Sequence, residues 1–438
     1  MNDFKSKILN DINSNKKNII GDFTIKEEYL KSFSRMETIN KKIADFKNSP
    51  NDFFENFDYN VYDKNYFSKN IDYKKLNCKI PENSNIITMI NGCFSNENTK
   101  IISKNITVSS FIEKIKNKYF ATEKHFLDYS EDNENQLTLL NSVLAKDGIY
   151  LHIHPNSIIE EPIYIVNVIT EQDKNFFFNH RKLIILDENS SAKIIETDLF
   201  LSNYKALSLN VCLTKQAKNS NLDYLHINSD INSNRKNHSK VSLIVRNEFK
   251  LDEDAKLNYN TVIFDSPFGQ NRTQFLLEGE NAEVNTAMFS YLRNDSVVDI
   301  ATLTSHLVPN TYSNQLVKTV ADDNSYFSFD GKILVSQNAQ KIKAAQNSHA
   351  ILLSDSAQVN CQPQLEIYAD DVECSHGTAI GNLEEEMMFY LNSRGIGKEE
   401  ANKLLFMAFA CDIIDKIPHK NMQDFIYSNL QEQIQSND

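Results

Sequence analysis

The middle of the chain is a succession of short runs rich in β-branched and aromatic residues, each bounded by a cluster of Asn, Asp, Ser or Gly. Such runs predict β-strands joined by turns, and few helix-length periodic segments interrupt them. We therefore expect an all-β domain from about residue 145 to 372. The runs that indicate strands are Ile149–Ile153, Ile163–Ile169, Lys182–Leu186, Leu207–Leu213, Val241–Val245, Phe275–Leu277, Gln315–Val320, Lys332–Val335 and Ile351–Leu353.

A weak repeat runs through this domain. Each copy has an apolar strand end, a short acidic turn, a small residue and then alternating polar and apolar positions, at intervals typical of solenoid coils. A right-handed parallel β-helix fits this pattern, and a sandwich or barrel of repeated hairpins remains open. Since the chain has only 10 glycines, its tight turns must rely on Asn and Asp. The small residues of the copies are Ala192, Ala255, Ala282, Ser325 and Ala357, and the longest interval, 192 to 255, has room for one more copy.

Helical patterns flank the β domain, so the expected fold is mainly β with α-helical regions at both ends. Before residue 80, Tyr29, Phe33, Met36, Ile39 and Ile43 recur at helical spacing. After Gly377, two helices are predicted, with Gly395 between them as a C-terminal stop. The predicted helices are Leu383–Ser393 and Lys398–Ile417, and the predicted regions are 1–85 (helical), 86–144 (transition), 145–377 (β-helix) and 378–438 (helical).

The second of these helices is apolar on nearly every side. Between Leu404 and Ile414 only Asp412 is polar, and such a helix must be covered all round. Two short helices at the end of a solenoid offer few neighbours. The cover is therefore either the chain itself, for example its N-terminal helices folding back, or another protein.

Composition narrows the class of protein. The 438 residues are 41% hydrophobic, enough for a large core, and carry a net charge of −13 without a Lys/Arg block, so a nucleic-acid partner is not expected. The longest apolar run, Leu404–Ala410, is too short to span a membrane, and no signal or transit segment is evident. The six cysteines form no CxxC pair, which favours reduced thiols in the cytoplasm. They are Cys78, Cys93, Cys212, Cys361, Cys374 and Cys411.

Cys374 and His376 are the strongest candidates for chemistry. Residues two apart in an extended segment face the same side, and a thiolate with an imidazole suits zinc, iron or iron–sulfur chemistry. Two ligands do not complete a four-coordinate site, which points to a contribution from a second chain. Cys361 and His349 are near enough in sequence to lie on adjacent coils. The alternative is a buried cysteine and a hydrogen-bonded histidine at the last coil.

Other constellations are weaker. His152 and His154 resemble half of a cupin metal site, but the expected glutamate is missing at the required spacing, so two polar side chains on one strand face are favoured. Acidic residues near 370 suggest a β-helical polysaccharide lyase or hydrolase. The repeat turns, however, lack the residues expected of a sugar-binding groove, which argues against such an enzyme. No phosphate loop, GxGxxG or GxSxG motif occurs, so this chain is not expected to hydrolyse ATP. The acidic residues are Glu366, Asp370, Asp371 and Glu373.

The C-terminal motifs carry a family resemblance. Gln364–Thr378 resembles the signature of the SufB/SufD family of iron–sulfur cluster assembly proteins, and Glu386–Ile396 resembles its FYLxSRGI element. The Cys-Ser-His-Gly run is similar to the SufD branch. The likeness covers roughly 330–417, reaches more loosely back to Asp147, and is poor over the first 140 residues. Further upstream matches are Asp330–Ile333, Ala339–Lys341 and Ala345–Gln346.

The resemblance implies a non-catalytic scaffold of a cytoplasmic SufBCD complex. It implies pairing with a SufB-like β-helix, docking of a SufC-like ABC ATPase, and indirect work with a cysteine desulfurase. His376, and with it Cys374, would hold iron or a transient Fe–S cluster at the interface. No cofactor is expected on this chain alone, and flavin binding is left open. The alternatives are a SufB-like subunit accepting sulfur on Cys212 or Cys361, and a carbohydrate-active enzyme. The residues expected to contact the ATPase are Arg394, Gly395, Leu405 and Phe409.

Overall fold

The fold is described from a computed structural model of the chain. The structure describes residues 4–16, 24–36, 47–49, 59–60, 80–81, 83–116, 136–170, 174–201, 204–228, 240–382, 385–417 and 420–435. Cys78 and most of the stretch 48–75 lie outside these ranges, as do Ile39 and Ile43 of the predicted N-terminal helical pattern.

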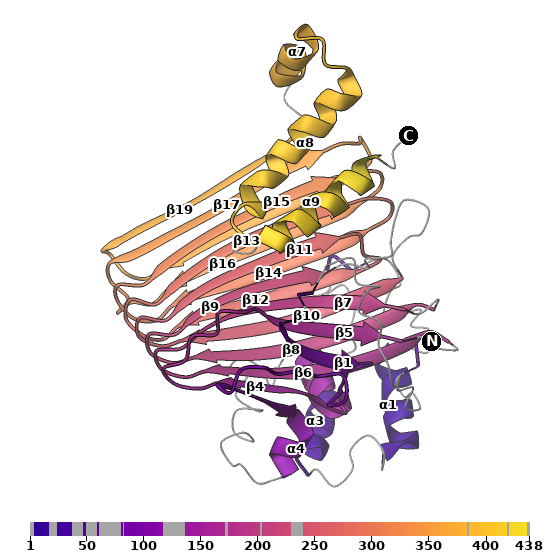
Figure 1. The fold of residues 1–438 in the computed structure, drawn as a ribbon, viewed down its shortest axis with the longest axis vertical. Coiled ribbons are helices and arrows are strands. Elements are labelled where there is room, and N and C mark those ends of the chain that lie inside the picture. Colours follow the sequence, from indigo (N-terminus) through magenta and orange to yellow (C-terminus); the bar gives the residue numbers. More distant parts are fainter. Residues whose placement is uncertain are drawn as a thin grey trace.

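The β domain is a parallel solenoid whose coils alternate between two sheets (Figure 1). A 10-stranded sheet has the order β19-β17-β15-β13-β11-β9-β7-β5-β1-β2, and a 9-stranded sheet has the order β18-β16-β14-β12-β10-β8-β6-β4-β3. Only β1–β2 and β3–β4 pair antiparallel among the described strands, so the predicted β-helix is confirmed and the hairpin sandwich or barrel is excluded.

The strands of the 10-stranded sheet are β1 (Asn85–Ile90), β2 (Cys93–Phe94), β5 (Ile163–Ile169), β7 (Ser191–Phe200), β9 (Asn221–Asn228), β11 (Lys256–Phe264), β13 (Glu283–Leu292), β15 (Tyr312–Ala321), β17 (Ile342–Leu352) and β19 (Val372–Gly381). Those of the 9-stranded sheet are β3 (Ile106–Ser110), β4 (Gly148–Ile153), β6 (Phe176–Leu186), β8 (Ala206–Gln216), β10 (Val241–Leu251), β12 (Gly269–Leu277), β14 (Val297–His306), β16 (Tyr326–Val335) and β18 (Gln358–Ile367).

Every predicted run falls in a strand except for Leu353, which follows the end of β17, but strands such as β9, β11 and β13 are missing from the prediction. The reason is that the interior of the solenoid, its lumen, accepts small polar side chains as well as apolar ones. Thr261 of β11 and Ser290 of β13 are fully buried. These positions weaken the apolar alternation by which a strand is recognised.

The corners of the coils show why small residues recur. The register places Ala255 beside Ser220, and Ser220 beside Ser190, each buried just before a strand of the 10-stranded sheet. The small residue at this corner of the first copy is therefore Ser190 and not the predicted Ala192. Ser220 is the small residue of the additional copy for which the interval from 192 to 255 left room. Ser325 and Ala357 lie at the opposite corner, before strands of the 9-stranded sheet.

Asparagine and aspartate do make the tight turns, as predicted. Asn189, Asn219, Asp254 and Asn281 have φ between +56° and +61°, a conformation that these residues tolerate. Their side chains also link successive coils, since Asn219 Nδ2 donates to Asn189 Oδ1 at 3.0 Å.

Helices cover the outer faces of both sheets. The N-terminal helices pack on the 9-stranded sheet, where Ile8, Phe33 and Leu140 join Phe177 and Leu209 in one core. Of the C-terminal helices, α8 and α9 pack on the 10-stranded sheet, whereas α7 projects beyond it (Figure 1). The described helices are α1 (Phe4–Ser14), α3 (Thr24–Arg35), α4 (Phe111–Lys116), α6 (Gln136–Leu144), α7 (Glu385–Ser393), α8 (Lys398–Ile414) and α9 (Lys420–Gln435).

The apolar helix α8 is covered by its own chain over part of its surface, by the solenoid together with α9, while Leu404 is 47% exposed, so the expectation of cover all round is not met. Phe406 is buried and packs edge-on against Tyr291 of β13, with ring centroids 4.9 Å apart. Lys318 of β15 donates to the Phe409 carbonyl at 3.1 Å and pairs with Asp412. The prediction of too few neighbours is wrong, because α8 lies along a sheet face and not across the end of the coil. The helix α9, absent from the prediction, completes the cover through Phe425 and Ile426.

Candidate functional site

The solenoid ends in an unfinished coil made by β18 and β19. Within the described residues β19 pairs only with β17, and β18 only with β16, so each strand leaves one backbone edge without a partner strand. Side chains that point into the lumen on β17 are fully covered by the next coil, whereas those on β19 face its open end. An open edge of this kind is a template for pairing with another chain.

Cys374 and His376 are both inward-facing residues of this last coil. Their register partners on β17, Ala344 and Gln346, are buried in the lumen. Cys374 is half-buried and packs against the core around Ile342, whereas His376 is exposed. The prediction that the two side chains share one face therefore agrees with the register. Burial raises the pKa of the Cys374 thiol, so a metal must displace its proton on binding.

Cys361 faces the same lumen from β18. Ser348 Oγ donates to its Sγ at 3.2 Å. Burial raises the pKa of the Cys361 thiol, and the hydrogen bond from Ser348 works in the opposite direction. His349, by contrast, is adjacent to Ser348 on β17 and lies on the outer face beside Lys318, its register partner. Of the two residues named as possible helpers, only Cys361 lies on the lumen side.

The described residues contain no group of three or more His, Cys, Asp or Glu side chains arranged to hold a metal ion. The donor set at the open end is thus a thiol and an imidazole, which fits iron or an iron–sulfur cluster as cargo only when a second protein supplies the remaining ligands.

The weaker sequence candidates have structural partners. His152 Nε2 lies 2.6 Å from Asp187 Oδ2, and His154 Nε2 lies 2.8 Å from Thr107 Oγ1. Glu366 pairs with Lys332 at 2.6 Å, and Glu373 pairs with Lys343 at 3.2 Å. These contacts favour strand-surface roles over a cupin-type site or a cluster of calcium-binding carboxylates.

Deep in the lumen lies a polar cluster that the sequence did not reveal. Glu196 of β7 forms a buried ion pair with Lys182 of β6 and accepts a hydrogen bond from Tyr224 at 2.5 Å. Asn167 donates to the same carboxylate at 2.8 Å, and His226 lies 3.9 Å from it. Burial alone would raise the pKa of Glu196, but Lys182 and His226, together with the hydrogen bonds, hold it well below its ordinary value.

Cys212, the buried cysteine proposed as a sulfur acceptor in the SufB-like alternative, belongs to this cluster by register. It is the β8 partner of Lys182, and burial raises the pKa of its thiol to about 11. Such a thiol is protonated at neutral pH and is a weak nucleophile.

A polar stripe continues from the cluster along the lumen to the open end. Asn247 Nδ2 donates to the Tyr259 hydroxyl at 2.9 Å, and Thr302 Oγ1 donates to Gln315 Oε1 at 3.1 Å. The stripe ends at His376. Its members, in register order, are Tyr224, Tyr259, Thr286, Gln315, Gln346 and His376 on the 10-stranded sheet, facing Lys182, Cys212, Asn247, Thr273, Thr302 and Gly331 on the 9-stranded sheet.

The helix α7 presents a second candidate surface. Phe389 is 75% exposed, and Met387 and Tyr390 are also exposed, although all three are apolar or aromatic. The Arg394 guanidinium lies 5.3 Å from the centre of the Tyr390 ring. Gly395, with φ +86°, ends the helix as predicted, since the amide of the following Ile396 donates to the Leu391 carbonyl.

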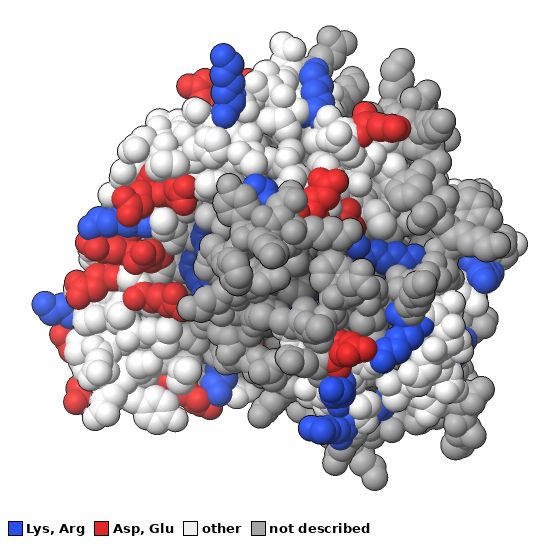
Figure 2. Space-filling model, turned by 90° about the horizontal axis from the view of Figure 1, so that it is seen from below, with Lys and Arg blue, Asp and Glu red and all other residues white. Residues whose placement is uncertain are grey.

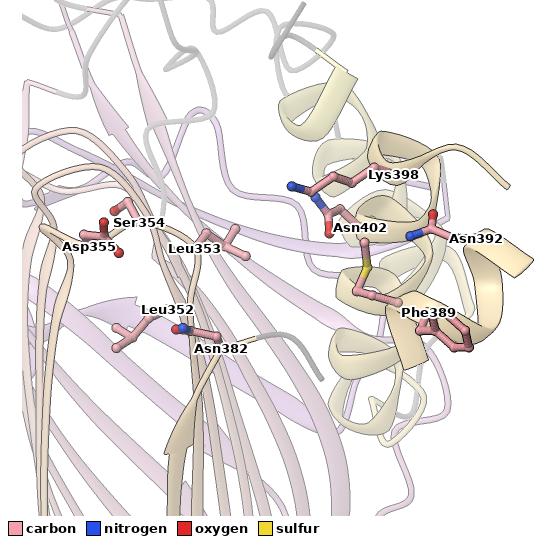
Figure 3. A pocket seen from close by; sticks show the side chains of 10 residues that line it. Leu352, Leu353, Ser354, Asp355, Asn382, Phe389, Asn392, Lys398 and Asn402 are labelled. Atoms are coloured by element: carbon pink, nitrogen blue, oxygen red, sulfur yellow. The ribbon is translucent and has the colours of Figure 1, made fainter. Parts of the chain in front are cut away.

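A cleft of about 620 Å³ separates α7 and the start of α8 from a corner of the solenoid (Figure 3). Of the residues predicted to contact an ATPase, Arg394 and Gly395 are exposed, while Leu405 and Phe409 are half-buried on α8. The cleft is lined by Leu352, Leu353, Ser354, Asp355, Asn382, Met388, Phe389, Asn392, Lys398 and Asn402.

On the face nearest the N-terminal helices, basic and acidic side chains of the described residues are interspersed (Figure 2). None of the helices in the described part of the chain has the length and apolar character needed to span a lipid bilayer.

A parallel solenoid flanked by helices, with an unfinished last coil that carries a thiol and an imidazole, defines a class of β-helical protein with open strand edges at one end. Residues 168–409 match the profile described as SUF system FeS cluster assembly, SufBD core domain, and residues 7–165 match the SufBD protein N-terminal region. The chain belongs to the SufBD family. The second match also corrects the expectation that the first 140 residues bear little likeness to the family.

Curated relatives agree with this assignment. The chain is 26% identical over 351 residues to an iron–sulfur cluster assembly SufBD family protein of Synechocystis sp., covering 77% of this chain and 75% of that protein. It is 31% identical over 184 residues to the iron–sulfur cluster assembly protein SufD of Escherichia coli, covering 42% and 44%. It is 24% identical over 315 residues to SufD of Bacillus subtilis, covering 71% and 70%. The chain is therefore a SufD-like member of the family.

Proposed function

We propose that this chain is a non-catalytic scaffold of a cytoplasmic Suf complex, in which a SufB-like β-helix pairs with its last coil. The observation that carries the proposal is the unfinished coil, with Cys374 and His376 directed to the open end of the lumen. The unpaired edges of β18 and β19 would continue into strands of the partner. The partner would then cover the lumen and supply the ligands that this chain lacks.

Iron or a nascent iron–sulfur cluster is the cargo of the proposed interface site, and no cofactor is held by this chain alone. His376 would bind through a neutral ring nitrogen and Cys374 as a thiolate. Since burial raises the pKa of Cys374, its proton leaves only when a cation or cluster stabilises the sulfur. We assign the imidazole the first contact, because it is exposed whereas Cys374 is half-buried.

We further propose that α7 docks a SufC-like ABC ATPase. The exposed aromatic and thioether side chains of Met387, Phe389 and Tyr390 lie on one short helix, with Arg394 beside them. Aromatic residues and arginine are enriched at interface hot spots. Nucleotide-driven movement of the ATPase subunits would reach the interface site through α8, which is anchored to the sheet by Lys318.

Replacing His376 with alanine should lower cluster assembly by the reconstituted complex at least about tenfold, the size of effect seen when a metal site loses a supporting group. Because the side chain is exposed, stability should change by less than about 0.5 kcal/mol. The measurement is iron–sulfur absorbance during assembly, with circular dichroism as the folding check.

Ser375→Ala is the matched control, because Ser375 lies on the same strand and is equally exposed. Co-purification of the tagged chain with an ATPase and a second β-helical protein is the companion measurement. Unchanged assembly in His376→Ala would refute the role of the imidazole, and a chain that captures neither partner would refute the scaffold.

Replacing Phe389 with alanine should weaken binding of the ATPase by about 30-fold, because a truncated aromatic hot spot costs about 2 kcal/mol. Calorimetric titration of the purified chain with the ATPase measures it. Tyr312→Ala removes an exposed aromatic residue from β15 and should leave the affinity unchanged. Equal affinities for the two variants would exclude α7 as the docking helix.

A further inference from the structure

Gln346 is the buried polar residue directly behind His376. The two are register partners on β17 and β19, and both point into the lumen. Gln346 is completely buried, and neither its Oε1 nor its Nε2 has a hydrogen-bond partner among the described residues. A buried amide with both polar atoms unpaired is costly and calls for a partner. The imidazole of His376, at the next register position on the open side, carries a matching polar group, and the two side chains are not hydrogen-bonded in this structure.

The preceding coil shows what Gln346 lacks. There, Gln315 occupies the same place on the sheet and accepts a hydrogen bond from Thr302 across the lumen. In the coil of Gln346, the register partner of Thr302 is Gly331, which has no side chain to donate. The threonine that would satisfy the glutamine is thus absent, and the amide keeps its hydrogen-bonding capacity.

Gly331 also makes room for this amide. A Cβ at Gly331 would lie 1.5 Å from Nε2 and 2.8 Å from Cδ of Gln346, a severe overlap. The φ of Gly331 is not in the left-handed region, so the glycine is required by space and not by backbone conformation. Because Gly331 has no side chain, the amide of Gln346 fits into the space beside it, below the last coil.

We propose that Gln346 is a positioning residue for His376: its amide oxygen accepts a hydrogen bond from one ring N–H and fixes the tautomer of the neutral imidazole. The other ring nitrogen then directs its lone pair toward the open end, where the cargo binds. Ligand histidines are commonly oriented by such a hydrogen bond at the nitrogen away from the metal. This inference rests on the proposed role of His376 as a ligand, but the tautomer can be measured without cargo or partner.

The test is the tautomer ratio of His376 in the full-length chain labelled with ¹⁵N-histidine, recorded at a pH where free imidazole is neutral. The resonance of His376 is assigned by its loss in His376→Gln. Gln346→Met keeps the volume but removes the hydrogen bond, and should shift the tautomer ratio about fivefold toward that of free imidazole, the worth of one ordinary hydrogen bond. An unchanged ratio in this variant overturns the proposal.

Two further variants separate positioning from packing. Gly331→Ala leaves both Gln346 and His376 in the sequence but pushes the Gln346 amide and the Phe329 ring aside, and should reproduce the shift. Gln315→Met makes the same chemical change one coil earlier and should leave the ratio unchanged. A shift of equal size in Gln315→Met would show general loosening and overturn the proposal. If the ratio shifts as expected while the variant complex assembles clusters normally, positioning stands and the ligand role of His376 fails.

Discussion

Replacing Lys182 with methionine is expected to lower the free energy of unfolding by about 3–5 kcal/mol, because it leaves a carboxylate charged and buried without its cation. Lys182 and Glu196 are both 1% exposed in their side chains, in the lumen between β6 and β7. The hydrogen bonds from Asn167 and Tyr224 remain in the variant, but they cannot replace a full charge. Urea unfolding followed by far-UV circular dichroism measures the loss.

Two control variants test whether the loss of the buried ion pair causes the loss of stability. Lys343→Met breaks a Lys–Glu pair between β17 and β19 whose side chains are 64% and 75% exposed, so the expected loss is below about 1 kcal/mol. The double variant Lys182→Met/Glu196→Gln removes both charges and should be more stable than the single variant. A single variant as stable as the wild type, or no recovery in the double variant, would contradict an ion pair as the source of the loss.

The shared strand face of Cys374 and His376 could be predicted from sequence because its geometry is local. Residues that are two positions apart on one strand face the same side, whatever the rest of the fold is. The surrounding motif indicated the family. Gln346 and Gly331 could not be found this way. Their contact depends on the register between strands of opposite sheets, and neither residue type alone suggests a buried polar site.

The buried polar cluster in the lumen could not be predicted from the sequence for a related reason. Lys182, Glu196 and His226 come from three strands, and each looks like an ordinary polar residue of a half-exposed strand. Their burial follows from the closure of the coil, which buries the lumen face of each strand, while the flanking helices cover much of the outer face. A sequence pattern that assumes one wet face therefore misreads them.

The surface that packs on α8 also could not be predicted from the sequence. The apolar run Leu404–Ile414 required a covering surface, and this requirement was correct. The surface itself is assembled from single outward-facing residues of different coils, such as Tyr291 of β13 and Lys318 of β15. No one segment carries enough of them to be recognised as a docking face.

Acidification should destabilise the protein well before its carboxylates titrate, because three buried histidines resist protonation in the folded state. Burial lowers the pKa of His180 to about 3, and that of His226 and His306 to about 4. His180 has no hydrogen-bond partner on either ring nitrogen among the described residues, whereas His306 is held between Thr311 and Ser313. In the unfolded chain each histidine binds its proton near pH 6.5.

Proton linkage gives the direction in which stability changes with pH. Above pH 6.5 these histidines are neutral in both states and add no pH dependence. Below it the unfolded state binds more protons, so stability falls until the folded pKa is reached, by about 3 kcal/mol each for His226 and His306 and about 5 kcal/mol for His180. Between pH 6.5 and 5 the three together should remove about 6 kcal/mol. Urea unfolding at a series of pH values measures this slope.

His306→Gln should reduce the slope in that window by about one third, since glutamine does not titrate. The slope should also persist at high salt, because buried groups are screened little by ions, whereas an effect of surface charges would shrink. A flat stability curve from pH 6.5 to 5, or a slope that disappears with salt, would show that these histidines already bind protons in the folded chain. The lumen would then be open to water, and the Lys182–Glu196 pair would lose the low-dielectric setting that makes its disruption so costly.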